Sequence, residues 1–174
     1  MKRLAMLVVL LAAWPVHADE RKDDDVRAKL KGYEEVPAVS TLARGRFKAQ
    51  IHRDGQAFDW ELTYSGLQAE VQQAHIHFAQ KRVNGAIVVW LCGSATNPGP
   101  AGTQTCPQSG TIRGTAMAGN VGPGAATQQL VAGEIAEVIA AMRAGVAYAN
   151  VHTSVSPGGE IRGQIRPKDD DNHD

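Results

Sequence analysis

Hydrophobic and polar residues alternate with a period of two along much of the chain, which is the pattern of β-strands with one buried face. Residues 46–53 and 57–64 show it most clearly, and the Asp54-Gly55 pair between them is a strong signal for a tight hairpin. Residues 86–91 form instead a continuous apolar run, which predicts a strand buried on both faces. The other expected strands are residues 73–79, 109–117, 146–154 and 159–166. About seven or eight short strands separated by turn residues predict an all-β sandwich or barrel.

One segment breaks this alternation. Residues 130–144 have the 3.6-residue period of an amphipathic helix, and Gly145 stands where a helix would end in a left-handed cap. The apolar stripe consists of Ile135, Val138, Ile139 and Met142. We therefore expect one short helix that packs against the sheet or caps an open end of it.

The two ends of the chain differ from its middle. Residues 1–18 combine a basic start, a short apolar run and small residues around Ala18, which predicts a signal peptide. Residues 19–27 and 167–174 are strongly charged and are expected to be disordered tails. The folded domain is expected over residues 28–166, in a periplasmic or secreted protein. No segment after the signal peptide is apolar enough to predict a membrane span.

The charge composition of the chain limits the kinds of partner that are expected. The 174 residues include 18 Lys and Arg against 18 Asp and Glu, so the chain is formally neutral. A neutral chain lacks the basic excess expected of a nucleic-acid-binding protein, and nucleic acid is therefore not a predicted partner. The 18 Gly and 8 Pro residues also argue against long helices.

The chain has two cysteines, Cys92 and Cys106, which flank a Gly-, Pro- and Thr-rich loop. In an oxidising compartment such a pair is expected to form a disulfide. A pair of metal-binding thiolates is the alternative, and the absence of Cys-x-x-Cys spacing speaks against it.

Histidines provide the candidate chemistry. His75 and His77 alternate within one expected strand, so their side chains share a face, with Cα atoms about 6.5–7 Å apart. His152 lies in another expected strand and supplies a third imidazole if the two strands are neighbours. Three imidazoles suit copper or zinc. The alternative is a half-buried polar layer of histidines that holds no metal. His52, beside a charged turn, is not expected to belong to the site.

Four polar residues near the histidine motifs are candidates for supporting roles. Tyr148 and Asn150 share a face with His152, where they could be weak ligands or could orient an imidazole. Glu160 and Arg162 follow a Pro-Gly-Gly turn and alternate on one face, with Ile161 directed inward. Their expected roles are a surface ion pair, a carboxylate acceptor for a site histidine, or a guide for an anionic ligand.

The order of these motifs resembles the CHRD (chordin-type) domain, as found in exported single-domain bacterial proteins. The resemblance runs from Leu30 to Ile165 and includes an opening Leu-x-Gly-x-x-Glu-Val-Pro motif. Its later motifs are Ala74-His-Ile-His77, Gly145-Val-Ala-Tyr-Ala-Asn-Val-His-Thr153 and Gly158-Gly-Glu-Ile-Arg-Gly163. It implies an immunoglobulin-like or Cu/Zn-dismutase-like Greek-key sandwich. It implies no general catalytic activity.

Three functions follow from this pattern. The first is an exported binding domain that holds copper or zinc through His75, His77 and His152, without catalysis. The second is a small copper-dependent redox enzyme similar to superoxide dismutase, although no bridging histidine or zinc-site aspartate is evident. The third is a metal-free domain that binds an extracytoplasmic protein.

Overall fold

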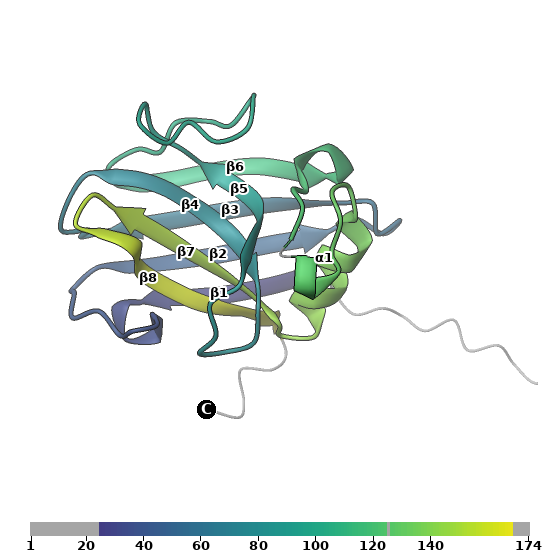
Figure 1. Ribbon diagram of the computed structural model, residues 1–174, viewed down its shortest axis with the longest axis horizontal. Helices are drawn as coiled ribbons and strands as arrows, with labels where there is room; N and C mark the ends of the chain where they lie inside the picture. Colours follow the sequence, from purple (N-terminus) through teal and green to yellow (C-terminus); the bar gives the residue numbers. More distant parts are fainter. Residues whose placement is uncertain (1–24, 125, 169–174) are drawn as a thin grey trace, which may run out of the picture.

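The computed structural model describes residues 25–168 apart from residue 125, and these form eight strands and one α-helix (Figure 1). The expected signal peptide and most of the two expected tails lie outside the described residues. The strands are β1 (Asp25–Lys31), β2 (Arg44–Ile51), β3 (Ala57–Ser65), β4 (Val71–Phe78), β5 (Ala86–Cys92), β6 (Gly110–Met117), β7 (Ala147–Thr153) and β8 (Ser156–Pro167). The helix α1 spans Ile135–Arg143, and short 3₁₀ turns include η1 (Gly32–Glu34).

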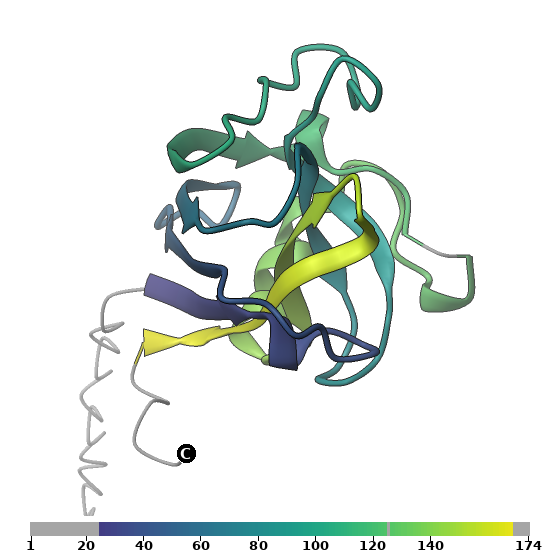
Figure 2. The same ribbon diagram turned by 90° about the vertical axis from the view of Figure 1, so that its left-hand side faces the viewer.

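All eight strands belong to one antiparallel sheet in the order β5-β4-β7-β8-β1-β2-β3-β6. The sheet curls into a nearly closed barrel, with its seam between β5 and β6 (Figure 2). Strand β7 returns to lie beside β4, and β6 lies beside β3, which gives Greek-key connections. The all-β prediction with one short helix is therefore confirmed.

The folded region is slightly longer at both ends than the sequence predicts. The domain was expected to begin at residue 28, whereas β1, a strand that the sequence pattern does not predict, begins at Asp25, and β8 continues to Pro167. Val26 explains the first difference, because its side chain is only 2% exposed and extends the apolar face of β1 into the charged segment. Residues 25–27 and 167 therefore belong to the domain and not to disordered tails.

The helix is shorter than its predicted range of 130–144 but buries the predicted stripe. Gly133 has a φ of +90°, a turn conformation that separates the preceding residues from α1. At the other end Gly145 has a φ of +69°, and the Val146 N–H donates to the Ala141 carbonyl at 2.9 Å, as in a Schellman cap. Among the described residues, no helix is long and apolar enough to cross a membrane.

The strand that is buried on both faces is β7 and not β5. Every residue of β7 is buried, whereas Ala86, Ile87 and Trp90 of β5 are partly exposed. The reason is position, because β5 lies at the edge of the sheet while β7 lies between β4 and β8. One face of β7 lines the barrel core, and loops cover the other, where its polar side chains lie.

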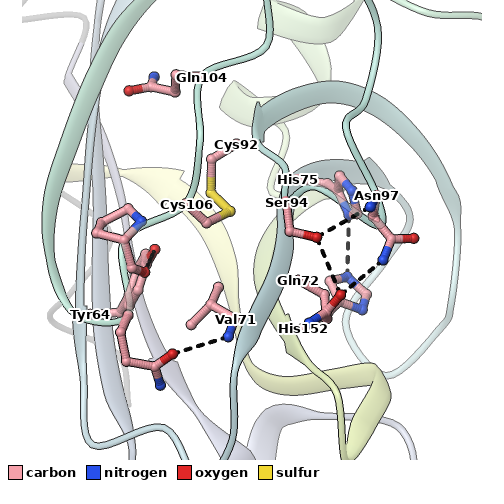
Figure 3. Close-up of a disulfide and its surroundings, with 12 residues drawn as sticks. Tyr64, Val71, Gln72, His75, Cys92, Ser94, Asn97, Gln104, Cys106 and His152 are labelled. Atoms are coloured by element: carbon pink, nitrogen blue, oxygen red, sulfur yellow. Dashed lines mark hydrogen bonds between the residues drawn. A yellow bond between two sulfur atoms is a disulfide. The ribbon is translucent and has the colours of Figure 1, made fainter.

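The predicted disulfide between Cys92 and Cys106 is present, with an S–S distance of 2.00 Å and a Cα–Cα distance of 5.0 Å. It joins the end of β5 to the loop that leads into β6 (Figure 3). The disulfide-closed loop therefore lies at the seam of the barrel. Such a cross-link is typical of proteins outside the cytosol.

Candidate metal centre

The three candidate histidines come from two neighbouring strands. Strand β4 pairs antiparallel with β7, so that His75 lies opposite Asn150 and Gln73 lies opposite His152. Between the histidines of β4, Ile76 is fully buried in the apolar core. The prediction that the two segments lie side by side is therefore confirmed, and all three imidazoles lie under the loops that cover the outer face of these strands.

The three imidazoles are buried and converge on one another. His75 Nδ1 lies 3.2 Å from His152 Nε2, and one ligand nitrogen from each of the three rings lies within 4.8 Å of the others. The exposed fractions are 0% for His75, 7% for His77 and 6% for His152. Nitrogen ligands about 2.0–2.1 Å from a tetrahedral metal lie roughly 3.3 Å apart, so the His75–His152 spacing already fits one ion.

Backbone carbonyls orient two of the rings. His77 Nδ1 lies 3.0 Å from the Gly85 carbonyl oxygen, and His152 Nδ1 lies 2.9 Å from that of Pro157. A carbonyl oxygen only accepts hydrogen bonds, so each Nδ1 carries the proton and each Nε2 presents a lone pair. Metal-binding histidines are commonly held in this way. The Nε2 atoms of His75 and His77 are buried and have no hydrogen-bond partner among the described residues.

Asn150 adds an oxygen to the cluster. Its Oδ1 lies 3.0 Å from His152 Nε2. The two ring nitrogens of His152 thus face two oxygens, those of Pro157 and Asn150. Neutral imidazole carries one N–H, so with the amide in this orientation only one of these contacts can be a hydrogen bond. A bound cation beside Nε2 would satisfy both atoms. The predicted supporting residue Asn150 thus lies within the cluster.

Burial keeps the imidazoles uncharged. Burial, with the neighbouring His152 and His77, lowers the pKa of His75 to about 2. The pKa of His77 falls to about 4, chiefly through burial, although its hydrogen bond to Gly85 raises it. Burial also lowers the pKa of His152. Neutral imidazole is the form that binds metals, so the cluster is in its ligand form at neutral pH.

Tyr148 and Arg162 support His77 through stacking. The rings of Tyr148 and His77 are parallel with centroids 4.6 Å apart, and the Arg162 guanidinium carbon lies 3.3 Å from the centroid of the Tyr148 ring. The Tyr148 hydroxyl oxygen accepts a hydrogen bond from the Gly85 N–H, and so contacts the residue that orients His77.

Arg162 also holds the loop between β4 and β5. Its guanidinium donates to Asn84 Oδ1 at 3.0 Å and to the Val83 carbonyl at 2.7 Å. With an exposed fraction of 1%, it is a buried structural cation. Among the described residues it forms no surface ion pair, and its burial speaks against the expected role as a guide for an anionic ligand.

Glu160 is separate from the histidines. Its carboxylate accepts hydrogen bonds from the hydroxyls of Thr41 and Thr153 and from the Gln68 N–H, and none from a histidine among the described residues. The pairing of β7 with β8 shifts between Val151 and Thr153, which breaks the strict alternation that placed Glu160 with Arg162. Glu160 therefore ties loops to the end of the barrel.

Two residues near the site were not predicted from the sequence. The Trp90 ring of β5 packs edge-on against His75 with centroids 4.3 Å apart, and Gly99 of the disulfide-closed loop lies against Trp90.

The second is Glu35, which is 6% exposed. Burial raises its pKa to about 7, although Arg162, the Val36 N–H and the Asn150 amide lower it. An added Cβ at Gly159 would lie 2.5 Å from Glu35 Oε1, so the glycine turn makes room for this carboxyl.

A polar network covers the site on the side of the disulfide. Gln72 Oε1 accepts hydrogen bonds from Ser94 and Asn97 of the disulfide-closed loop, next to His75 and His152 (Figure 3). The disulfide-closed loop thus forms part of the cover. His52 lies away from the cluster, 3.1 Å from Asp59 on another strand, as expected.

These features define a disulfide-bonded Greek-key β-barrel with a buried cluster of three histidines. The chain belongs to the CHRD domain family, whose sequence profile matches residues 26–165. No curated protein gives a significant match, and no solved structure does so either. The family resemblance is therefore confirmed over nearly the whole described region, and the role of the histidine cluster rests on its own geometry.

Proposed function

We propose that this protein is an exported binding protein, periplasmic or secreted, that holds one copper or zinc ion through His75, His77 and His152. The observation that carries the proposal is the convergence of three neutral, buried imidazoles whose candidate ligand atoms lie within 4.8 Å of one another. Asn150 Oδ1, 3.0 Å from His152 Nε2, is the proposed fourth ligand. The disulfide and the CHRD domain support a location outside the cytosol.

Burial supports binding rather than catalysis. A catalytic metal needs an open coordination position that substrate reaches from solvent. Here each imidazole is at most 7% exposed, Trp90 packs against His75, and the disulfide-closed loop lies over Trp90. An ion held in this way is suited to storage, transfer or stabilisation of the domain.

Metal titration tests this proposal. The protein lacking residues 1–18, stripped with a chelator, is titrated with Cu(II) and Zn(II) by calorimetry. We expect about one equivalent to bind, with nitrogen hyperfine structure in the Cu(II) electron paramagnetic resonance spectrum. Free metal at 100 times its Kd should stabilise the fold by about 2.7 kcal/mol.

The matched variants are His75→Ala/His77→Ala and His52→Ala. His52 lies outside the cluster, so its substitution should leave metal uptake unchanged, while the double substitution should abolish it. Equal uptake by the double variant and the wild type would rule out the site. Zn(II) binding should also release few protons near pH 7, because the ligands are already neutral.

A further inference from the structure

Strands β1 and β2 carry cations directly opposite one another. Their antiparallel register pairs Arg27 with Lys48, Lys29 with Arg46, and Lys31 with Arg44. We call these six residues the basic ladder. All six occupy the alternate positions that face away from the core, since the residues between them are buried or contact it. Like charges directly opposite in a sheet are destabilising, so the basic ladder lowers the stability of the folded domain.

In the part of the chain that the structure describes, carboxylates neutralise little of the basic ladder. Those at its margins pair with cations outside it: Asp25 with Lys168, Glu34 with Lys81, and Glu61 with Arg113. Among the described residues, no carboxylate lies within ion-pair distance of Lys29, Lys31, Arg46 or Lys48. Glu61 lies directly opposite Lys48 in the register of β2 with β3, so the described residues leave Lys29, Lys31 and Arg46 as the uncompensated cations of the ladder.

All of the basic ladder except Arg44 lines a groove of about 890 Å³ on the outer face of the sheet. Carboxylates also lie in this lining, at Asp25, Glu34, Asp59 and Glu61. Arg166 of β8 extends the positive lining on the other side of β1. Along each strand the cations recur every two residues, about 6.5–7 Å apart, and across the strands about 5 Å apart. Two parallel rows of regularly spaced cations match a linear chain of anionic groups.

We propose that this groove binds a linear acidic polysaccharide carrying carboxylate or sulfate groups. Two observations favour a polysaccharide over a nucleic acid. Trp60, the only aromatic residue among the described residues that line the groove, is 6% exposed and so offers no surface on which bases could stack. The disulfide is that of a protein outside the cytosol, where acidic glycans are exposed. The groove lies on β1, β2 and β3, away from the histidines of β4 and β7.

Binding is tested with the protein lacking residues 1–18 and three labelled probes: heparin, alginate and a 20-base-pair DNA duplex. Fluorescence anisotropy gives each Kd at about 50 and 200 mM salt. We expect both polysaccharides to bind more tightly than the duplex, and we expect the affinity to fall at least tenfold across this range as counterions compete.

Two double variants with the same change in net charge separate local from global effects. Arg46→Glu/Lys48→Glu reverses the centre of the ladder and should weaken polysaccharide binding at least tenfold. Arg53→Glu/Arg82→Glu alters exposed arginines that do not line the groove and should change the Kd less than threefold. The ladder variant places Glu opposite Lys29 and Arg27 on β1 but also opposite Glu61 on β3, so these effects on stability oppose each other and little change in melting temperature is expected. If this variant does not fold, Lys29→Glu takes its place.

Several results would overturn the proposal. One is failure of wild-type protein to bind either polysaccharide at low salt. Another is equal loss of affinity in the two double variants, which would show a response to net charge alone. Duplex binding as tight as heparin binding would assign the groove to nucleic acid instead.

Discussion

The buried carboxyl group of Glu35 makes the stability of the metal-free protein depend on pH in a specific way. Its pKa is raised from 4.5 to about 7, mainly because burial disfavours the charged form. A carboxyl whose pKa is higher in the folded than in the unfolded state binds protons preferentially when folded. Its stabilising contribution is therefore fully present below pH 4.5 and is lost as the pH rises through 7.

Glu35→Gln removes this titration and keeps a side chain of similar size. The rise in the pKa of Glu35 from 4.5 to about 7 makes the free energy of unfolding about 2–3 kcal/mol larger at pH 5 than at pH 8. The free energy of unfolding of the wild type, relative to that of the variant, should therefore be larger at pH 5 than at pH 8 by that amount. The histidines titrate in both proteins, so their contribution cancels in the comparison.

The assay is urea denaturation of both proteins at pH 5 and pH 8, each treated with a chelator. Glu137→Gln, which removes an exposed carboxyl of α1, is the matched control. A gap between wild type and Glu35→Gln that changes by less than about 1 kcal/mol would refute the argument. So would a midpoint near pH 4.5 in a carbon-13 titration of the Glu35 carboxyl.

Three further outcomes test the fold itself. Ile161 is fully buried, so Ile161→Asp should lower the free energy of unfolding by about 4 kcal/mol or more; a loss below about 1 kcal/mol would mean that the side chain does not face the core. Reduction of Cys92–Cys106 should cost about 3 kcal/mol in urea denaturation, and thiol titration of the denatured, unreduced protein should detect no free thiol. Arg46→Glu should raise stability by about 0.2–1 kcal/mol at low salt, by facing Lys29 with an opposite charge, and unchanged stability would argue against that pairing.

The sequence predicts most of the fold because side-chain alternation is a local property. It locates β2 to β8 within a few residues and predicts the buried stripe of α1. It misses β1, where apolar residues alternate within a strongly charged segment. It also assigns double burial to the apolar run of β5, because the composition of a strand does not reveal whether the strand lies at an edge.

The histidine cluster is predictable in part for the same reason. The spacing of His75 and His77 fixes a shared face, whereas the position of His152 depends on the pairing of β4 with β7. Glu35 and Trp90 reach the site through loops and a neighbouring strand that the sequence pattern does not order. The register shift between β7 and β8, which separates Glu160 from the histidines, likewise cannot be seen in the alternation of apolar and polar residues.

Net charge was the least informative feature. Equal totals of 18 basic and 18 acidic residues suggested no basic face. The fold nevertheless gathers six cations on β1 and β2, because both strands alternate in phase and pair antiparallel. Charge segregation thus depends on the register of the sheet and is not visible in the total.

The seam of the barrel has a consequence for self-association. Unpaired backbone groups at a sheet edge can act as a template for a strand from another molecule. Here the loop closed by the disulfide occupies both margins, since Gly93 after β5 bonds to Gln104 and the Gln104 side chain bonds to the Arg113 carbonyl of β6. Breaking the sulfur–sulfur bond would loosen the contacts at Gly93 and Arg113, whereas the middle of β5 stays bonded to Val121 and Gly122. Intermolecular strand pairing under reducing conditions is therefore expected at the β6 margin.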